Sequence, residues 1–243
     1  MKRFVKKVLF YGDSNTYGYD PAGFMGGRYP KESRWTEVLQ MNLRGLWRVV
    51  SDGEPGRGLP SAGYEWAYLQ SVLEKEAPVD LFAVMLGTND ILGTTRPDAE
   101  RAAGRMEELI SFVKEYLDRS TGEDLKEVLA GNRSLPGILL IAPPSFELSD
   151  VSFGEPYVAG GRSLAQAYRE EAEKFTARCR EIAEREHLFF ADASAWDLPL
   201  AFDGVHLSEG GNMMFAAEMI DVLRHIWNGS GHSCEGCTGT CPV

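Results

Sequence analysis

The sequence has no long hydrophobic run, no excess of basic over acidic residues and few cysteines, and each of these absences excludes some classes of protein. No apolar stretch is long enough to cross a bilayer. The formal net charge of −11 argues against a nucleic acid or an anionic membrane surface as a partner. Basic residues near the N-terminus resemble the start of a signal peptide, but the apolar run behind them is short and meets Asp13. We therefore expect a cytoplasmic protein.

Nucleotide-binding loops and internal repeats are missing as well. The sequence has neither Gly-x₄-Gly-Lys nor a Gly-x-Gly-x₂-Gly motif that opens a helix after the first expected strand, so nucleotide binding is not favoured. The length of 243 residues and the apolar share of 44% are those of one ordinary globular domain. We expect this domain over residues 1–228 and a Gly- and Cys-rich tail over residues 229–243.

Only four cysteines are present, and three of them fall in the expected tail. Cys234, Cys237 and Cys241 lie close to His232, and these residue types bind zinc. A lone Cys-x₂-Cys is a weak signal, because a second pair at zinc-finger spacing is missing. The tail is therefore either a metal-binding segment or a Gly-rich extension. For the domain itself we expect no metal and no cofactor.

Strand and helix patterns alternate along most of the chain. Apolar runs predict five strands, and the third is continuous enough to be buried on both faces, as in a parallel sheet. The expected strands cover 8–11, 47–51, 81–86, 137–141 and 188–191. The expected helices cover 34–39, 65–76, 98–117, 163–186 and 209–227. This order predicts a three-layer α/β/α sandwich with a five-stranded parallel sheet.

The first expected strand ends abruptly at Gly12-Asp13-Ser14-Asn15. Chemistry in open α/β sheets collects at the carboxyl ends of strands, so Ser14 is a candidate nucleophile. A serine hydroxyl needs a base, which is commonly a histidine held in one tautomer by a carboxylate. The alternative is that this segment only begins the next helix, because Asp, Ser and Asn all cap helices well.

His206 is the best candidate for the base among the four histidines. It alone has an aspartate three residues before it, and the loop between them contains glycine, so Asp203 can reach the imidazole ring. His187 and His225 lie near expected helix ends, where histidine suits the helix dipole or the surface. The alternative for His206 is a capping or packing role.

Acyl transfer also needs hydrogen-bond donors for the oxyanion that develops on the carbonyl. Gly56 can turn its backbone N–H into a site, because glycine permits unusual dihedral angles. Asn89 can offer its side-chain amide, and the backbone N–H of Ser14 is a third donor. Alternatively, Gly56 forms a plain turn, and Asn89 caps a helix or supports its loop.

Four short motifs resemble the blocks of the SGNH, or GDSL, hydrolase family, and they occur in the family's order from residue 12 to residue 206. They are Gly12-Asp13-Ser14, the glycine in the loop after the second expected strand, Gly87-x-Asn89-Asp90 and Asp203-x-x-His206. The resemblance implies the flavodoxin-like fold of that family and the activity of a carboxylic ester hydrolase.

The same resemblance implies a role for each site residue. Ser14 is the expected nucleophile, His206 the base and Asp203 the carboxylate that orients it. The expected oxyanion hole consists of Ser14, Gly56 and Asn89.

Three further segments are similar to the arylesterase and acyltransferase branch of the family: Arg34-Trp35-Thr36, Gly53-x-x-Gly56-Arg57 and Met85-Leu86-Gly87-Thr88-Asn89-Asp90. That branch acts on short acyl esters, passes the acyl group to water, alcohols or peroxide, and often forms oligomers. We therefore expect a homo-oligomeric esterase that takes a small acyl ester. The residues expected to contact the substrate are Asp13, Tyr17, Trp35 and Val205. The competing hypothesis is a catalytically idle domain that binds a glycan or lipid in the same pocket.

Overall fold

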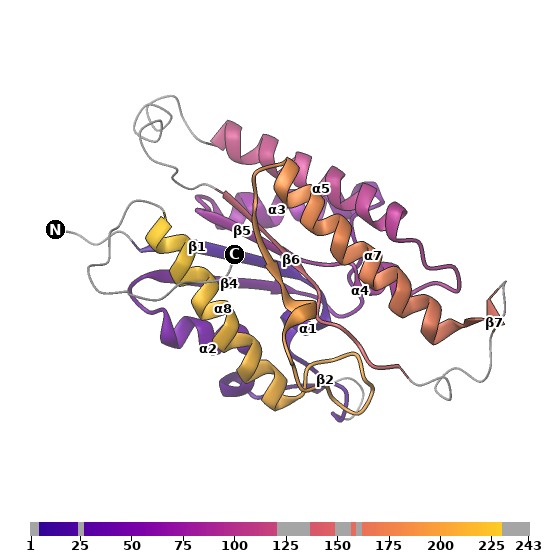
Figure 1. The fold of residues 1–243 in the computed structure, drawn as a ribbon. Helices are drawn as coiled ribbons and strands as arrows, with labels where there is room; N and C mark the ends of the chain where they lie inside the picture. Colours follow the sequence, from indigo (N-terminus) through magenta and orange to yellow (C-terminus); the bar gives the residue numbers. More distant parts are fainter. Residues whose placement is uncertain (1–4, 24–26, 121–136, 149–156, 159–161, 230–243) are drawn as a thin grey trace.

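A computed structural model describes residues 5–23, 27–120, 137–148, 157–158 and 162–229. Within these residues, five strands form a parallel sheet in the order β4-β1-β5-β6-β9 (Figure 1). In chain order this arrangement is 2-1-3-4-5, the flavodoxin-like order, and it confirms the expected fold class. The strands are β1 (Lys6–Gly12), β4 (Trp47–Gly53), β5 (Leu81–Met85), β6 (Gly137–Ala142) and β9 (Phe189–Asp192).

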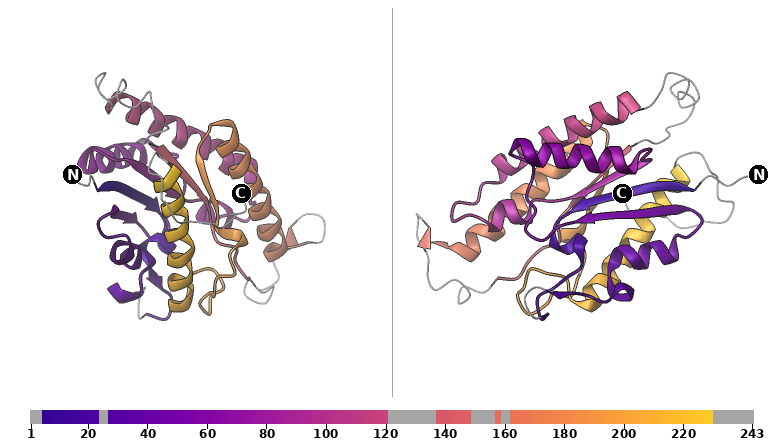
Figure 2. Two further views of the ribbon diagram at one scale, coloured as in Figure 1. Left: turned by 60° about the vertical axis from the view of Figure 1, so that its left-hand side comes forward. Right: turned by 180° about the vertical axis from the view of Figure 1, so that it is seen from behind.

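Helices cover both faces of the sheet and give the molecule three layers (Figure 2). One face carries α3 (Gly63–Glu76), α5 (Ala99–Ser120) and α7 (Leu164–Arg185). The opposite face carries α2 (Trp35–Asn42) and α8 (Glu209–Gly229). Each interface between layers has its own cluster of buried apolar side chains, so alternate residues of the central strands stabilise opposite faces of the sheet.

Short elements that the sequence patterns did not predict surround the carboxyl ends of the strands. Two are single-turn helices and four are two-residue strands, which are too short to show a periodic pattern. They are α1 (Ser14–Tyr17), α4 (Thr88–Leu92), β2 (Tyr19–Asp20) paired with β3 (Gly27–Arg28), and β7 (Tyr157–Val158) paired with β8 (Arg162–Ser163). Two 3₁₀ turns cover Lys31–Ser33 and Ala193–Ala195.

The C-terminal helix α8 ends at Gly229, the only residue of the expected tail that the structure describes. The expected zinc-type ligands of the tail therefore lie outside the described residues. In the part of the chain that is described, no three His, Cys, Asp or Glu side chains gather as metal ligands would. None of the described helices is long and apolar enough to cross a membrane.

The turn from β5 into α4 depends on Gly87. Its φ of 122° lies in a region that side chains of L-residues rarely adopt. A Cβ atom placed on Gly87 would lie 2.2 Å from Cε1 of Phe175, a buried residue of α7. Close packing of α7 on this turn therefore sets where α4 begins.

Replacing Gly87 by alanine is expected to lower the free energy of unfolding by about 1–3 kcal/mol, because the methyl group imposes backbone strain and displaces Phe175. Urea denaturation followed by tryptophan fluorescence measures the change. Gly104→Ala is the matched control, since Gly104 lies on the exposed side of α5 and a Cβ there meets no atom within 4 Å. Equal losses in the two variants would contradict the account of the turn.

Candidate active site

Three strands end side by side beneath the candidate site. Gly12, the last residue of β1, pairs in register with Gly53 of β4 and with Met85 of β5. The loops that follow these strands therefore leave the sheet at the same level. After β1 the chain forms a helix on one face of the sheet, and after β4 it forms a helix on the other face. The order of the strands therefore reverses at this point. Such switch points hold ligands in open α/β folds.

Ser14, His206 and Asp203 form a continuous chain of hydrogen bonds at this edge. The Ser14 hydroxyl oxygen lies 2.9 Å from Nε2 of His206, and Nδ1 of His206 lies 2.6 Å from Oδ2 of Asp203. An ionised carboxylate can only accept hydrogen bonds, so Nδ1 carries the proton and Nε2 is free to accept the Ser14 proton. The sequence expected these three residues to meet, and the structure brings them together.

The His206 loop is attached to the nucleophile loop through Asn15. The backbone N–H of Leu207 donates to Oδ1 of Asn15 at 2.9 Å, and the Asn15 amide donates to the carbonyl of Val205 at 3.4 Å. The ring of Tyr19 also packs against the imidazole, with 4.6 Å between ring centroids. Residue 15 therefore fixes residues 205–207 although 190 positions separate them along the chain. Sequence reasoning gave Asn15 no such role.

Asp203 orients both the imidazole and its own loop. Its Oδ1 accepts the main-chain N–H groups of Val205 at 3.0 Å and His206 at 3.1 Å. Partial burial alone would raise the pKa of Asp203, but these bonds and the bond from the His206 ring lower it below its usual value. Asp203 is therefore ionised at neutral pH and accepts the Nδ1–H of the imidazole.

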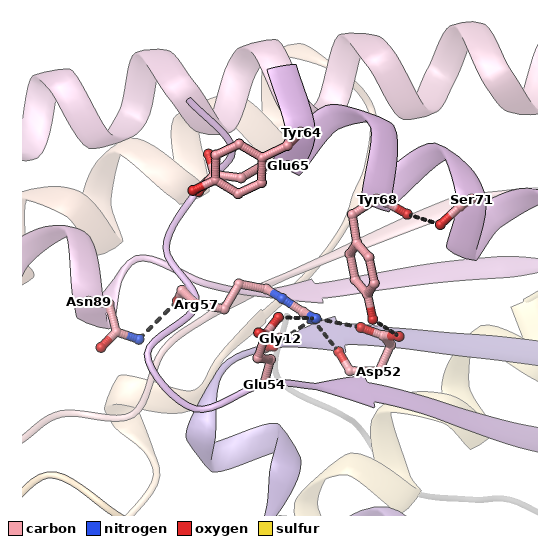
Figure 3. A network of polar contacts seen from close by, with 9 residues as sticks. All are labelled: Gly12, Asp52, Glu54, Arg57, Tyr64, Glu65, Tyr68, Ser71 and Asn89. Carbon is pink, nitrogen blue, oxygen red and sulfur yellow. Dashed lines mark hydrogen bonds and ion pairs between the residues drawn. The ribbon is translucent and has the colours of Figure 1, made fainter. Parts of the chain in front are cut away.

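The expected oxyanion donors come from three neighbouring segments. Ser14 opens α1, where backbone N–H groups lack partners within the helix. Gly56 has a φ of 81° and lies in the exposed loop after β4. The Asn89 amide donates one hydrogen to the carbonyl of Arg57 at 2.9 Å, which leaves its second hydrogen for another acceptor (Figure 3).

Two cavities lie against these loops. The smaller measures about 230 Å³, and its mostly apolar wall includes Thr88, Ile91, Phe146 and Phe175. The larger measures about 690 Å³ and is polar. Its described lining includes two residues that the sequence assigned to the site, Tyr17 and Gly56, and also the exposed tyrosines Tyr64 and Tyr68.

Comparison with known proteins identifies the family of the chain. Residues 10–213 match the model of the GDSL-like lipase/acylhydrolase family, a span that holds all of these motifs. The chain belongs to this family. It is accordingly a carboxylic ester hydrolase by family. No curated protein matched the chain by sequence.

Solved structures share the fold over nearly their whole length. A carbohydrate acetylesterase family member from Sinorhizobium meliloti is 27% identical, with a TM-score of 0.72 over 92% of this chain and 100% of that one. A protein from Agrobacterium tumefaciens assigned as an arylesterase is 30% identical, with a TM-score of 0.70 over 91% and 100%. An aryl esterase from M. Smegmatis, at 22% identity and a TM-score of 0.68 over 91% and 99%, shows the fold alone.

Four residues were expected to contact the substrate, and they differ in where the structure places them. Tyr17 lines the larger cavity, with the Arg28 guanidinium 4.1 Å above its ring. Val205 is partly buried and packs against the apolar core on the face of the sheet that α3, α5 and α7 cover. For Trp35 the expectation is wrong: its side chain is 0% exposed, packs between Phe10 and Phe215, and donates its indole N–H to the carbonyl of Asn15.

Asp13 is buried as well, and its side chain stabilises the turn into α1. Its Oδ1 accepts the N–H of Asn15 at 2.9 Å and so caps α1, and its carboxylate also bonds the Thr88 side chain. Burial raises the pKa of Asp13 to about 6, although these bonds and the nearby His206 act in the opposite direction. With 1% of its surface exposed, Asp13 does not reach a substrate.

The stability of the protein should report the raised pKa of Asp13. Between the ordinary pKa of 3.8 and about 6, the folded state keeps a proton that the unfolded state has lost, so raising the pH destabilises the fold. Asp13→Asn keeps the cap but cannot ionise. Relative to this variant, the free energy of unfolding of the wild type should fall by about 2 kcal/mol between about pH 4.5 and about pH 7.5. Urea denaturation at both pH values gives the difference, and parallel pH profiles would refute the assignment.

Proposed function

We propose that this protein is a serine esterase that hydrolyses short-chain acyl esters through a covalent acyl-enzyme. The hydrogen-bonded chain from Ser14 through His206 to Asp203 is the single observation that carries the proposal. A hydroxyl, an imidazole and an ionised carboxylate in this order are the parts that nucleophilic acyl transfer requires. Membership of an ester-hydrolase family supports the same chemistry.

In the first half-reaction, Nε2 of His206 takes the Ser14 proton as the oxygen attacks the ester carbonyl. A C–O bond forms, and the carbonyl electrons move onto oxygen. The backbone N–H groups of Ser14 and Gly56 and the free amide hydrogen of Asn89 stabilise this oxyanion. His206 then gives its proton to the alcohol oxygen as the old C–O bond breaks.

The second half-reaction reverses these steps with a new acceptor. Water gives up a proton to His206 and attacks the acyl-enzyme, which releases the acid and restores Ser14. An alcohol in place of water would yield a new ester, so the same site can transfer acyl groups. Asp203 stays ionised throughout and stabilises the imidazolium that forms in each half.

Ser14→Ala is expected to reduce turnover of p-nitrophenyl acetate to the background rate, because the acyl-enzyme can no longer form. A fluorophosphonate probe should label the wild type and leave the variant unlabelled. Ser71→Ala is the matched control, since Ser71 is an exposed serine on α3. An unlabelled wild type would favour the idle binding domain, and a fully active Ser14→Ala protein would exclude Ser14 as the nucleophile.

The smaller cavity supports short acyl groups. Its apolar wall suits a hydrocarbon chain, and it adjoins Thr88, the residue that precedes Asn89. At about 230 Å³ it has little room for a long chain. We therefore assign it to the acyl half of the ester. The larger, polar cavity beside Gly56 is left for the alcohol half, and its tyrosine-rich wall suits an aryl or a sugar alcohol, the classes for which the structural neighbours are named.

Filling the smaller cavity should shorten the preferred acyl chain. Ala172 lines it, so Ala172→Leu is expected to lower kcat/KM for p-nitrophenyl butyrate at least about tenfold relative to the acetate. Ala177→Leu places the same side chain on the exposed face of the same helix and should leave the ratio unchanged. Steady-state kinetics over a series of p-nitrophenyl esters measures both. An unchanged ratio in Ala172→Leu would show that the acyl group does not bind in this cavity.

A further inference from the structure

Arg57 has a large charged side chain that is almost completely enclosed. Its side chain is only 7% exposed. The sequence assigned no role in the site to Arg57. Nη1 donates to the carbonyl of Gly12 at 2.9 Å, and Nη2 donates to Oδ1 of Asp52 at 2.6 Å and to Oε2 of Glu54 at 3.0 Å (Figure 3). The guanidinium therefore joins the end of β1 to the end of β4 and to the loop that follows it.

Two tyrosine rings pack against the guanidinium of Arg57. Its central carbon lies 4.2 Å from the ring centroid of Tyr11 and 5.4 Å from that of Tyr68. The Tyr68 hydroxyl in turn donates to Oδ2 of Asp52 at 3.1 Å, and in Figure 3 the Tyr68 side chain points down from α3 toward this carboxylate. Both terminal nitrogens of the guanidinium and its face therefore have fixed partners, which restrict the rotation of the Arg57 side chain.

The main chain of Arg57 makes the third connection. Its carbonyl accepts the Asn89 amide at 2.9 Å, and its N–H donates to the carbonyl of Glu54 at 3.1 Å. The N–H of Glu54 donates a hydrogen bond to the carbonyl of Gly12 at 3.2 Å. One residue thus links the segment before Ser14, the turn that holds Gly56 and the amide of Asn89.

We propose that Arg57 is the positioning residue of the oxyanion hole. Arg57 lines the larger cavity, but its guanidinium is bound to Gly12, Asp52 and Glu54. It acts by setting the relative places of the three donors. The inference rests on the proposed serine esterase mechanism. Oxyanion donors must lie about 2.7–3.1 Å from the developing charge, so small displacements of a donor segment are costly. Lysine cannot replace the planar fork, because its ammonium group makes no paired parallel bonds.

Substitution of Arg57 should weaken binding of the transition state and leave ground-state binding nearly unchanged. In Arg57→Lys and Arg57→Gln, kcat for p-nitrophenyl acetate is expected to fall about tenfold to hundredfold while KM stays within about twofold. An aryl trifluoromethyl ketone provides the second readout. Ser14 adds to its carbonyl and generates a tetrahedral oxyanion, so its inhibition constant should rise by about the same factor as kcat falls.

Arg180→Gln is the matched control, because Arg180 also pairs with a carboxylate, that of Asp192, but lies exposed on α7 away from the donor segments. It should keep wild-type kcat and inhibition constant. Near-ultraviolet circular dichroism establishes that each variant is folded. In Arg57→Ala, millimolar guanidinium chloride should restore part of kcat by occupying the vacated site, with no such gain in Arg180→Ala.

Folded Arg57 variants with the wild-type kcat and inhibition constant would overturn the proposal. A fall in kcat without a matching rise in the inhibition constant would overturn it too, because the loss would then not lie in oxyanion binding. If Arg57→Lys and Arg57→Gln do not fold, absence of guanidinium rescue in Arg57→Ala decides against it. Failure of the serine mechanism itself is distinct, since the ketone would then not inhibit the wild type and Ser14→Ala would stay active.

Discussion

The parallel register of β4, β1 and β5 is the constraint on which the rest of the site depends. Gly12 pairs with Gly53 on one side and with Met85 on the other, so three chain segments from distant parts of the sequence leave the sheet together. Backbone hydrogen bonds of the ladders fix this alignment before any functional side chain is considered. The candidate nucleophile and the candidate oxyanion donors are consequences of that common edge.

The two aspartates near His206 illustrate how environment separates chemically identical groups. Asp203 is only partly buried and accepts three hydrogen bonds, which lower its pKa. Asp13 lies beneath the nucleophile in an almost closed space, and burial raises its pKa to about 6. Opposite shifts of two carboxyl groups around one reacting centre are typical of enzyme sites. Here only Asp203 is aligned with the imidazole, through the 2.6 Å bond to Nδ1.

The apolar period of the sequence predicted the five strands and the longer helices, because that period is a local signal. The meeting of Ser14 with His206 is not local, and its prediction came from the resemblance to the family's motifs. Shorter features escaped prediction. The four residues of α1 contain barely one turn, and the contacts of Asn15 and Arg57 join segments far apart along the chain. Trp35 was misassigned because its place within the Arg34-Trp35-Thr36 segment does not show whether its side chain faces the cavity or the core. The homo-oligomer and the cytoplasmic location stay predictions.

The bond between Asn15 and Leu207 has a consequence for how the protein is made. A ribosome releases the amino end of a chain first, so the hydroxyl-bearing loop emerges long before the imidazole-bearing one. Until the segment that contains Leu207 has left the exit tunnel, the nascent chain holds a serine with no partner to deprotonate it. Reactivity in this molecule therefore arises only after that later segment has folded against the serine loop.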